Sequence, residues 1–323
     1  MSYKIVVSDT KVMDGETRAA VLDAVDATVE TTGSKEPAAV ARVVKGADAL
    51  IVDAGTQVTA EVIDAADSLK VVGRAGIGVD NIDVRAAVDA GVTVVNVPDY
   101  SVEEVSTHAF ALMLACLRKI PMFDRSVKSG EWEWSTGQPL HRLAGSTVGL
   151  VAFGKLARRF AAKLRGFDVD VIAYDPYVPE YRMGDLGVES VTFETLLTDS
   201  DVVSLHAPLT DETRGLIDAN ALDRMRDDAL LVNTARGGLV DETALYDALV
   251  SGDLGGAGLD VRESEPPGAS SLHDLDSVVC SPHVAWYSEE SRVELTRTVA
   301  EDVVRVLRGE DPENPIDSET GWF

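Results

Sequence analysis

Residues 147–157, with the sequence TVGLVAFGKLA, decide the fold. An apolar run at the start of this stretch predicts a strand, and a turn containing Gly154 leads into the amphipathic residues 155–165. A second apolar run, residues 169–174, ends at Asp175. Strand, glycine turn, helix, strand and acid in this order are typical of a βαβ unit that binds a dinucleotide. Amide groups at the helix N-terminus hold the pyrophosphate, and the acid binds the adenosine ribose hydroxyls.

The glycine fingerprint of this unit is altered, because the three glycine positions of the GxGxxG pattern are occupied by Ala152, Gly154 and Ala157. The retained glycine is the one at which the backbone approaches phosphate, so we expect pyrophosphate binding to survive. Ala152 replaces the glycine of the tight turn, and its methyl group is expected to crowd that turn. An ordinary strand-to-helix turn is the alternative interpretation, and Asp175 favours the dinucleotide site.

The same alternation of strand and helix continues along the whole chain. Short apolar or β-branched runs are separated by amphipathic stretches, which predicts parallel sheets covered by helices on both faces. The expected strands are residues 4–7, 50–52, 71–72, 92–95, 147–151, 169–174, 202–205, 230–232, 258–261 and 278–279. The expected helices include residues 15–26, 57–67, 155–165, 217–225 and 241–251.

These strands are too many for one comfortable doubly wound sheet, so we predict two α/β domains, each with a doubly wound parallel sheet. The longest helix candidate, residues 102–120, separates the fourth strand from the fifth. The amphipathic residues 289–308 are long enough to return to the first domain. The expected boundaries are residues 1–100 with 294–323 for one domain and 101–293 for the other. Residues 126–143 are expected to form a projecting arm or loop.

The chain is strongly acidic, with 55 Asp and Glu against 29 Lys and Arg and a formal net charge of −26. This charge disfavours nucleic acid and anionic membranes as partners. The acids are dispersed and there are only nine lysines, a composition that suggests adaptation to a salty cytoplasm. An ordinary acidic protein is the alternative.

Cysteine usage and the N-terminus predict a cytoplasmic protein without a metal site. Cys116 and Cys280 lie in apolar runs without metal-ligand spacing, so we expect buried, reduced thiols. The N-terminal residues lack the apolar core of a signal peptide, and the longest apolar helical stretch, residues 110–117, is far shorter than the ~20 residues of a membrane span.

Three motifs in the second half of the chain carry a family resemblance. They are LVNTARGGLVDE at residues 231–242, LDVRESEP at 259–266 and SPHVAWY at 281–287, and RAGIGVDNID at 74–83 extends the pattern. The chain resembles the NAD-dependent D-isomer-specific 2-hydroxyacid dehydrogenase family. YDPY at residues 174–177, together with a Trp three residues after the motif His, makes it most similar to the C-terminal-binding-protein branch. The resemblance implies a flavodoxin-like substrate domain, a Rossmann coenzyme domain, NAD as coenzyme and a homodimer joined through the 102–145 region.

Reduction of a 2-keto acid needs a hydride donor, a cation that grips the carboxylate and polarises the ketone, and a proton donor for the developing alkoxide. The resemblance implies that Arg236 is the cation and that His283 is the acid, or the base in the oxidative direction. Glu265 is expected to pair with His283 and to orient its ring.

The resemblance also implies coenzyme and substrate contacts beyond these three residues. The expected coenzyme-binding residues are Gly154, Lys155, Leu156, Asp175, His206, Ala207, Pro208, Thr213, Thr234, Ala235, Arg236, Asp260 and His283. The expected substrate-binding residues are Arg74, Gly76, Ile77, Arg236, His283 and Trp286. Competing interpretations are a satisfied strand-end histidine for His206, a structural ion pair for Arg74 and core packing for Trp286.

The sequence therefore favours a cytoplasmic enzyme that interconverts a D-2-hydroxy acid and a 2-keto acid with NAD. Asp175 is followed by Pro176 and Tyr177 without an arginine to neutralise a 2′-phosphate, which favours NAD over NADP. One alternative is a coenzyme-sensing, corepressor-like interaction protein, although the chain ends soon after the returning helix without a long disordered tail. Another is 3-phosphoglycerate dehydrogenase lacking a regulatory domain.

Overall fold

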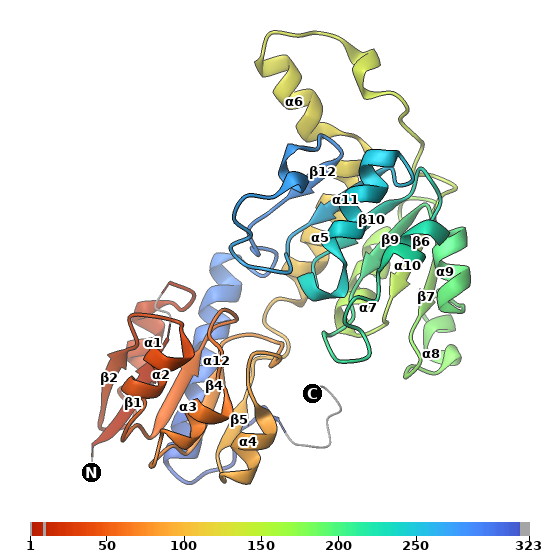
Figure 1. The fold of residues 1–323 in the computed structure, drawn as a ribbon. Helices are drawn as coiled ribbons and strands as arrows, with labels where there is room; N and C mark the ends of the chain where they lie inside the picture. Colours follow the sequence, from red (N-terminus) through yellow and green to blue (C-terminus); the bar gives the residue numbers. More distant parts are fainter. Residues whose placement is uncertain (1, 9–10, 317–323) are drawn as a thin grey trace. The chain divides into compact units, whose positions relative to one another are not determined.

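The computed structural model describes residues 2–8 and 11–316, which divide into two compact α/β units (Figure 1). Unit 1 comprises Met1–Ser101 and Tyr287–Phe323, and unit 2 comprises Val102–Trp286. Each unit holds one predominantly parallel sheet, as predicted from the alternating strands and helices. Within the described part of the chain, no helix is both long and apolar enough to span a membrane.

The sheet of unit 1 has the strand order β13-β5-β4-β3-β1-β2, and only β13 runs antiparallel to its neighbour. The order reverses at β1, as in flavodoxin-like sheets. The strands are β1 (Tyr3–Val7), β2 (Ala27–Thr31), β3 (Ala49–Val52), β4 (Val71–Arg74), β5 (Thr93–Val95) and β13 (Pro315–Ile316). The helices are α1 (Gly15–Leu22), α2 (Pro37–Val43), α3 (Ala60–Asp64), α4 (Val84–Asp89) and α12 (Glu289–Leu307).

Helix α12 packs directly on strand β4, and a glycine makes this approach possible. A Cβ placed on Gly73 would lie 2.9 Å from a methyl carbon of Val299 and 3.0 Å from one of Val303. On the other face of the sheet, Val40, Val62 and other buried side chains of α2, α3 and α4 form a core with the central strands. The long C-terminal helix is therefore an integral layer of unit 1.

The sheet of unit 2 is fully parallel, with the strand order β12-β11-β10-β9-β6-β7-β8. The order reverses at β6, which is the first strand of the predicted dinucleotide unit. The strands are β6 (Thr147–Val151), β7 (Asp170–Tyr174), β8 (Glu189–Ser190), β9 (Val202–Leu205), β10 (Leu230–Asn233), β11 (Gly256–Leu259) and β12 (Val278–Cys280). The helices are α5 (Val102–Leu117), α6 (Ile120–Lys128), α7 (Lys155–Leu164), α8 (Glu180–Gly184), α9 (Phe193–Asp199), α10 (Ala219–Arg224) and α11 (Glu242–Ser251), with 3-10 turns at Trp134–Gly137, Gly237–Leu239 and Ser271–Asp274.

Two apolar cores lie on opposite faces of this sheet. Buried side chains of α9, α10 and α11 form one core, and those of α5, α7 and α8 form the other. Glu103 on α5 also forms ion pairs with Arg159 and Lys163 on α7. Hydrogen bonds from these two cations lower the pKa of the Glu103 carboxyl to about 2. Helices α5 and α7 are thus joined by charge at their solvent-exposed side as well as by apolar packing.

Several local expectations need correction. Strands β2, β8 and β13 were not predicted, because they are short or exposed strands at or near sheet edges. The expected single helix over residues 102–120 is interrupted near Lys119, whose backbone is left-handed (φ 49°). Helix α6 follows and ends at Lys128, so the predicted arm of residues 126–143 begins inside a helix. Cys280 is exposed rather than buried, since it ends the edge strand β12, whereas Cys116 is buried as expected.

The strained turn at Ala152 predicts a stabilising substitution. Ala152 has a left-handed backbone (φ 69°), a conformation that costs a residue with a Cβ about 1–2 kcal/mol. Since glycine avoids this cost but loses more chain entropy, we expect Ala152→Gly to raise the free energy of unfolding by about 0.5–1 kcal/mol. Ala157→Gly, in the buried face of helix α7, should instead lower it by about 1–2 kcal/mol. Denaturant unfolding of both variants measures the difference, and equal signs would contradict this account.

Candidate active site

The glycine turn before helix α7 is open to a ligand. Gly154 is the N-cap of α7, and a Cβ placed on it would meet no protein atom within 4 Å. Asp175 lies directly after β7, where one carboxylate oxygen accepts a hydrogen bond from the Phe153 amide (2.8 Å) and the other from the Tyr177 amide (2.8 Å). Asp175 therefore holds the turn in shape, and its carboxylate retains lone pairs for further donors.

Two buried polar atoms that have no hydrogen-bond partner among residues 2–8 and 11–316 lie beyond neighbouring strands of the same sheet. His206 follows β9; its Nε2 contacts the Ser204 hydroxyl at 3.0 Å, but its Nδ1 has no partner in this part of the chain. Thr234 follows β10, and its hydroxyl likewise has none. Burial lowers the pKa of His206 to about 4, so the ring is neutral at neutral pH. Buried polar atoms of this kind are satisfied by ordered water or by a ligand, and a dinucleotide coenzyme has polar groups that could serve both.

The remaining expected coenzyme residues lie around the same turns. Lys155 and Leu156 are in the first turn of α7, and Ala207 and Pro208 follow β9. Thr213 donates a hydrogen bond to the Pro208 carbonyl (2.6 Å) and thereby closes the loop after β9. These residues surround the carboxyl ends of β6 and β9, the topological switch point at which doubly wound sheets bind ligands.

Glu265 and His283 form a close pair. The Nδ1 atom of His283 lies 2.6 Å from Oε2 of Glu265. The other carboxylate oxygen of Glu265 accepts the amide of Arg262 (3.0 Å). Burial raises the pKa of Glu265, but the hydrogen bonds from His283 and Arg262 and the charges of His283 and Arg236 outweigh it, so the pKa is lowered overall. Glu265 is thus held as a carboxylate that fixes the His283 ring.

Arg236 lies on the turn after β10, and an asparagine organises that turn. The Asn233 side chain accepts a hydrogen bond from the Ala235 amide (3.0 Å) and donates one to the Arg236 carbonyl (2.8 Å). Arg236 itself donates from Nη1 to the carbonyl of Ala235 (2.8 Å) and acts electrostatically on Glu265. Asn233 was not predicted, although it belongs to the motif of residues 231–242.

The loop that carries His283 is organised by Asp260, which is buried. One oxygen of Asp260 accepts hydrogen bonds from the Ser281 hydroxyl (2.6 Å) and the Val284 amide (2.9 Å), and the other accepts the Ala285 amide (2.9 Å). His283 has a left-handed backbone (φ 52°) inside this loop. The carboxylate of Asp260, an expected coenzyme-binding residue, therefore also holds the loop of the candidate catalytic histidine.

Two further residues border this loop. His108 on α5 lies with Nε2 2.8 Å from the Ser281 hydroxyl and 3.5 Å from Asp260, a connection that no sequence motif indicated. Trp286 is partly exposed, and its indole N–H donates to the His283 carbonyl (3.1 Å). Nowhere in residues 2–8 and 11–316 do three or more His, Cys, Asp or Glu side chains gather in a way that could hold a metal ion.

The expected substrate residues Arg74, Gly76 and Ile77 belong to unit 1. Arg74 ends β4, is buried, and donates to the carbonyl of Ala75 (2.7 Å). Gly76 has φ 145°, and a Cβ there would lie 1.6 Å from Nη1 of Arg74, so the guanidinium lies over the glycine. The carbonyl of Ile77 accepts a hydrogen bond from Asn96 (2.6 Å).

Comparison with known families agrees with this geometry. Residues 110–285 match the model for "D-isomer specific 2-hydroxyacid dehydrogenase, NAD binding domain". The chain belongs to this family. Its coenzyme is NAD, the dinucleotide that the matched domain binds.

Relatives and solved structures of the family match most of the length of this chain. It is 44% identical over 270 residues to D-3-phosphoglycerate dehydrogenase of Archaeoglobus fulgidus, covering 83% of this chain and 51% of the relative. It is 41% identical over 269 residues to hydroxypyruvate reductase of Thermotoga maritima, covering 82% and 87%. The chain thus spans about half the length of the phosphoglycerate dehydrogenases it matches. D-lactate dehydrogenase of Aquifex aeolicus, solved with NAD and lactic acid, has a TM-score of 0.87 at 27% identity, covering 97% of this chain and 98% of that one.

Burial of the His206 ring predicts that the free energy of unfolding decreases as the pH falls. The folded protein keeps His206 neutral down to a pKa of about 4, whereas the unfolded chain binds a proton near pH 6.5. Stability is therefore present above pH 6.5 and is lost as the pH falls to 4, by at most about 3 kcal/mol. His206→Gln should lose less stability than the parent over this range in urea unfolding, while His141→Gln, at an exposed histidine, should follow the parent. Identical pH dependence of parent and His206→Gln would refute the prediction.

Proposed function

We propose that the protein interconverts a D-2-hydroxy acid and a 2-keto acid, with Arg236, Glu265 and His283 as its catalytic residues. The observation that carries the proposal is the Glu265–His283 pair, which stands beside Arg236 in the unit with the dinucleotide fold. When bound, NADH supplies the hydride that reaches C2 of the keto acid. Gly154, Asp175, His206 and Thr234 would hold this coenzyme.

Proton transfer is assigned to Nε2 of His283, because Nδ1 is engaged by Glu265. In the direction of reduction, protonated His283 donates from Nε2 to the oxygen that becomes the hydroxyl. Glu265 stabilises the imidazolium and fixes the plane of the ring. Arg236 binds the carboxylate and polarises the ketone with its planar fork. In unit 1, we propose that Arg74 and the backbone of Gly76 and Ile77 bind substrate, and in unit 2 that Trp286 borders its side chain.

The names of the relatives narrow the substrate class. Hydroxypyruvate and phosphohydroxypyruvate are both 2-keto acids with an oxygen on C3, so we propose that the substrate belongs to this small class. The acidic, lysine-poor surface supports an enzyme adapted to a salty cytoplasm. A coenzyme-sensing interaction protein, as the likeness to the C-terminal-binding-protein branch allows, is the second candidate.

Turnover separates these candidates. Oxidation of NADH in concentrated KCl should be fastest with hydroxypyruvate or phosphohydroxypyruvate among a panel that includes pyruvate and glyoxylate. Reduction of the keto acid should be slower when NADPH replaces NADH, because Asp175 repels a 2′-phosphate.

Arg236→Lys should lower kcat/KM by at least ~10²-fold, since a point charge replaces the planar fork of the guanidinium. His283→Ala should abolish reduction while NADH binding changes little. Absence of turnover with every keto acid, despite NADH binding, would favour the interaction protein.

A homodimer is proposed from the exposed apolar side chains of helix α6 and of the arm that follows it. Helix α6 and the segment after it extend away from the sheet of unit 2 (Figure 1). Trp132 and Trp134 are 89% and 75% exposed, and Ile120 and Val127 on α6 are also exposed. Apolar groups gathered on one exposed segment mark an interaction surface, and a second copy of the chain is the proposed partner.

Removal of the two tryptophans should dissociate the dimer. We expect sedimentation velocity to give a dimer for the parent protein and a monomer for Trp132→Ser combined with Trp134→Ser, because two large apolar contacts are lost. Tyr181→Ser, at an exposed aromatic on α8 in the same unit, should leave the dimer intact. A monomeric parent protein at micromolar concentration would disprove the homodimer.

A further inference from the structure

A buried arginine lies behind the candidate catalytic pair and takes no part in the proposed reaction. Arg262 follows β11 and is only 7% exposed. Burial of a guanidinium is costly unless its donors are satisfied, so its partners indicate what it stabilises.

The main partner of Arg262 is Glu242, at the start of helix α11. Nε of Arg262 donates to one carboxylate oxygen of Glu242 (2.8 Å), and Nη2 donates to the other (2.7 Å). Burial raises the pKa of Glu242, but the hydrogen bonds and charge of Arg262 outweigh this, so its pKa is lowered overall. The pair is a two-point contact that a lysine cannot reproduce.

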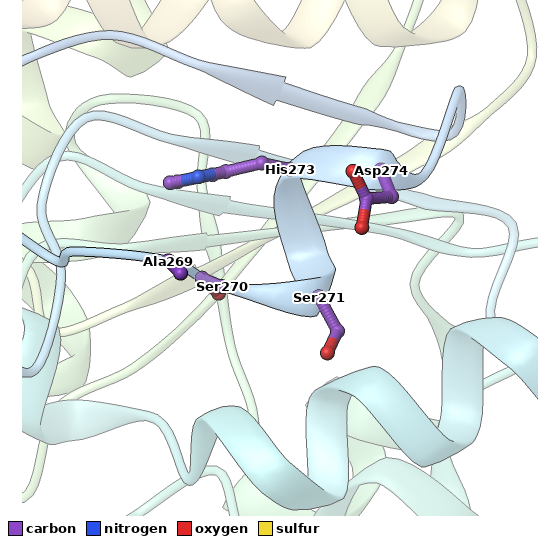
Figure 2. Close-up of a pocket in the computed structure, with 5 residues that line it drawn as sticks. All are labelled: Ala269, Ser270, Ser271, His273 and Asp274. Atoms are coloured by element: carbon purple, nitrogen blue, oxygen red, sulfur yellow. The ribbon is translucent and has the colours of Figure 1, made fainter.

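The other donors of the guanidinium reach the segment before β12. Nη1 of Arg262 contacts Nε2 of His273 at 2.8 Å, and Nη2 donates to the Ser270 hydroxyl at 2.9 Å. Both side chains border a surface pocket of about 370 Å³, lined by Ala269, Ser270, Ser271, His273 and Asp274 (Figure 2). Arg262 therefore ties helix α11 and the 270–273 turn to its own position.

The backbone of Arg262 is the point at which this cluster meets the candidate catalytic residues. Its amide donates to Oε1 of Glu265, while Oε2 of Glu265 holds His283. The next amide, that of Glu263, donates to Glu242 (2.8 Å). The peptide between residues 262 and 263 is thus fixed on one side by Glu242 and in turn fixes Glu265.

The same peptide supports the Arg236 turn. Gly237 packs so closely on it that a Cβ at Gly237 would lie 1.9 Å from the carbonyl carbon of Arg262 and 2.3 Å from the amide nitrogen of Glu263. One short stretch of backbone therefore contacts the turn of Arg236 and the side chain of Glu265. A shift of this stretch would displace the cation and the acid–base pair relative to each other.

We propose that Arg262, clamped by Glu242, is a positioning residue that fixes the 262–263 peptide and thereby aligns Glu265–His283 with Arg236. The proposal rests on the proposed dehydrogenase function. In this role the buried Arg262–Glu242 ion pair holds the 262–263 peptide in one geometry, and the acid–base pair gains a rigid support. Arg262 itself touches neither substrate nor coenzyme in this assignment.

The test compares Arg262→Met, Arg262→Lys and Glu242→Gln with Arg224→Met. Arg224 forms an exposed ion pair with Glu194 (2.8 Å) in the same unit and serves as the matched control. We expect Arg262→Met and Glu242→Gln to lower kcat by at least about tenfold while the Kd for NADH stays within about threefold, with Arg262→Lys between them and the parent. The control should retain parental kcat.

The pH profile of kcat/KM distinguishes positioning from a general loss of folded protein. A smaller folded fraction scales the whole profile, whereas misplacement of Glu265 changes its macroscopic pKa values. The acidic pKa should rise in Arg262→Met, because displacement of the 262–263 peptide weakens the backbone amide hydrogen bond that helps to lower the pKa of Glu265. An unchanged profile, or a kcat for Arg262→Met within about twofold of the parent, would overturn the proposal. If Arg262→Met does not fold, Arg262→Lys and Glu242→Gln decide by the same criteria.

A spectroscopic signal keeps this test independent of turnover. The ring nitrogens of ¹⁵N-histidine report the Nδ1–H hydrogen bond of His283, and His283→Gln assigns that resonance among the five histidines. The signal should shift in Arg262→Met and stay unchanged in Arg224→Met. If the parent protein turns over no keto acid, the proposed function fails while this measurement still decides whether Arg262 positions the pair. A parental signal in folded Arg262→Met would overturn the positioning role.

Discussion

The parallel direction of every strand in unit 2 is the constraint on which the candidate site depends. Because parallel strands all end at the same edge, the residues that follow β9, β10 and β11 are brought to one side of the sheet. His206, Thr234 and Asp260 occupy these positions. An antiparallel strand in this set would carry its following residue to the opposite edge, and the buried polar atoms at these positions would no longer face a common ligand.

Hydrogen bonds to Asp260 offset the backbone strain at the candidate catalytic histidine, His283. A left-handed backbone at a residue such as His283 costs about 1–2 kcal/mol. Asp260 accepts two backbone amides and the hydroxyl of Ser281 from the surrounding loop, and hydrogen bonds to a charged acceptor contribute about 1.5–3 kcal/mol each. The loop is therefore stable in a conformation that would be unfavourable alone, and this conformation directs the His283 ring to Glu265.

Sequence patterns over a few residues predict those parts of the fold that interactions between neighbouring residues determine. The two α/β sheets, the turn at Gly154 and the acid at Asp175 follow from apolar periodicity and glycine chemistry within short stretches of sequence. The exposed strand β2 gave no such signal, since its side chains lack an apolar pattern that the core would impose. The exposure of Cys280 depends on its place at the end of an edge strand, which the residue sequence around it does not encode.

The arrangement behind Glu265 was unpredictable for a different reason. Arg262 and Glu242 are 20 residues apart, and nothing in either motif indicates that the other side chain will be its partner. Their contact arises only when β10 and β11 lie side by side and α11 begins beside the loop after β11. The motifs thus identify the groups suited to the chemistry, whereas the register of the parallel sheet decides which buried charges hold those groups in place.

A protein of net charge −26 repels anions at long range, and salt screens that field within about 8 Å at physiological ionic strength. Recognition of an anionic keto acid, the substrate class we propose, would therefore depend on groups in direct contact with it, so the alignment of Arg236 with the acid–base pair matters more than the sign of the surface charge.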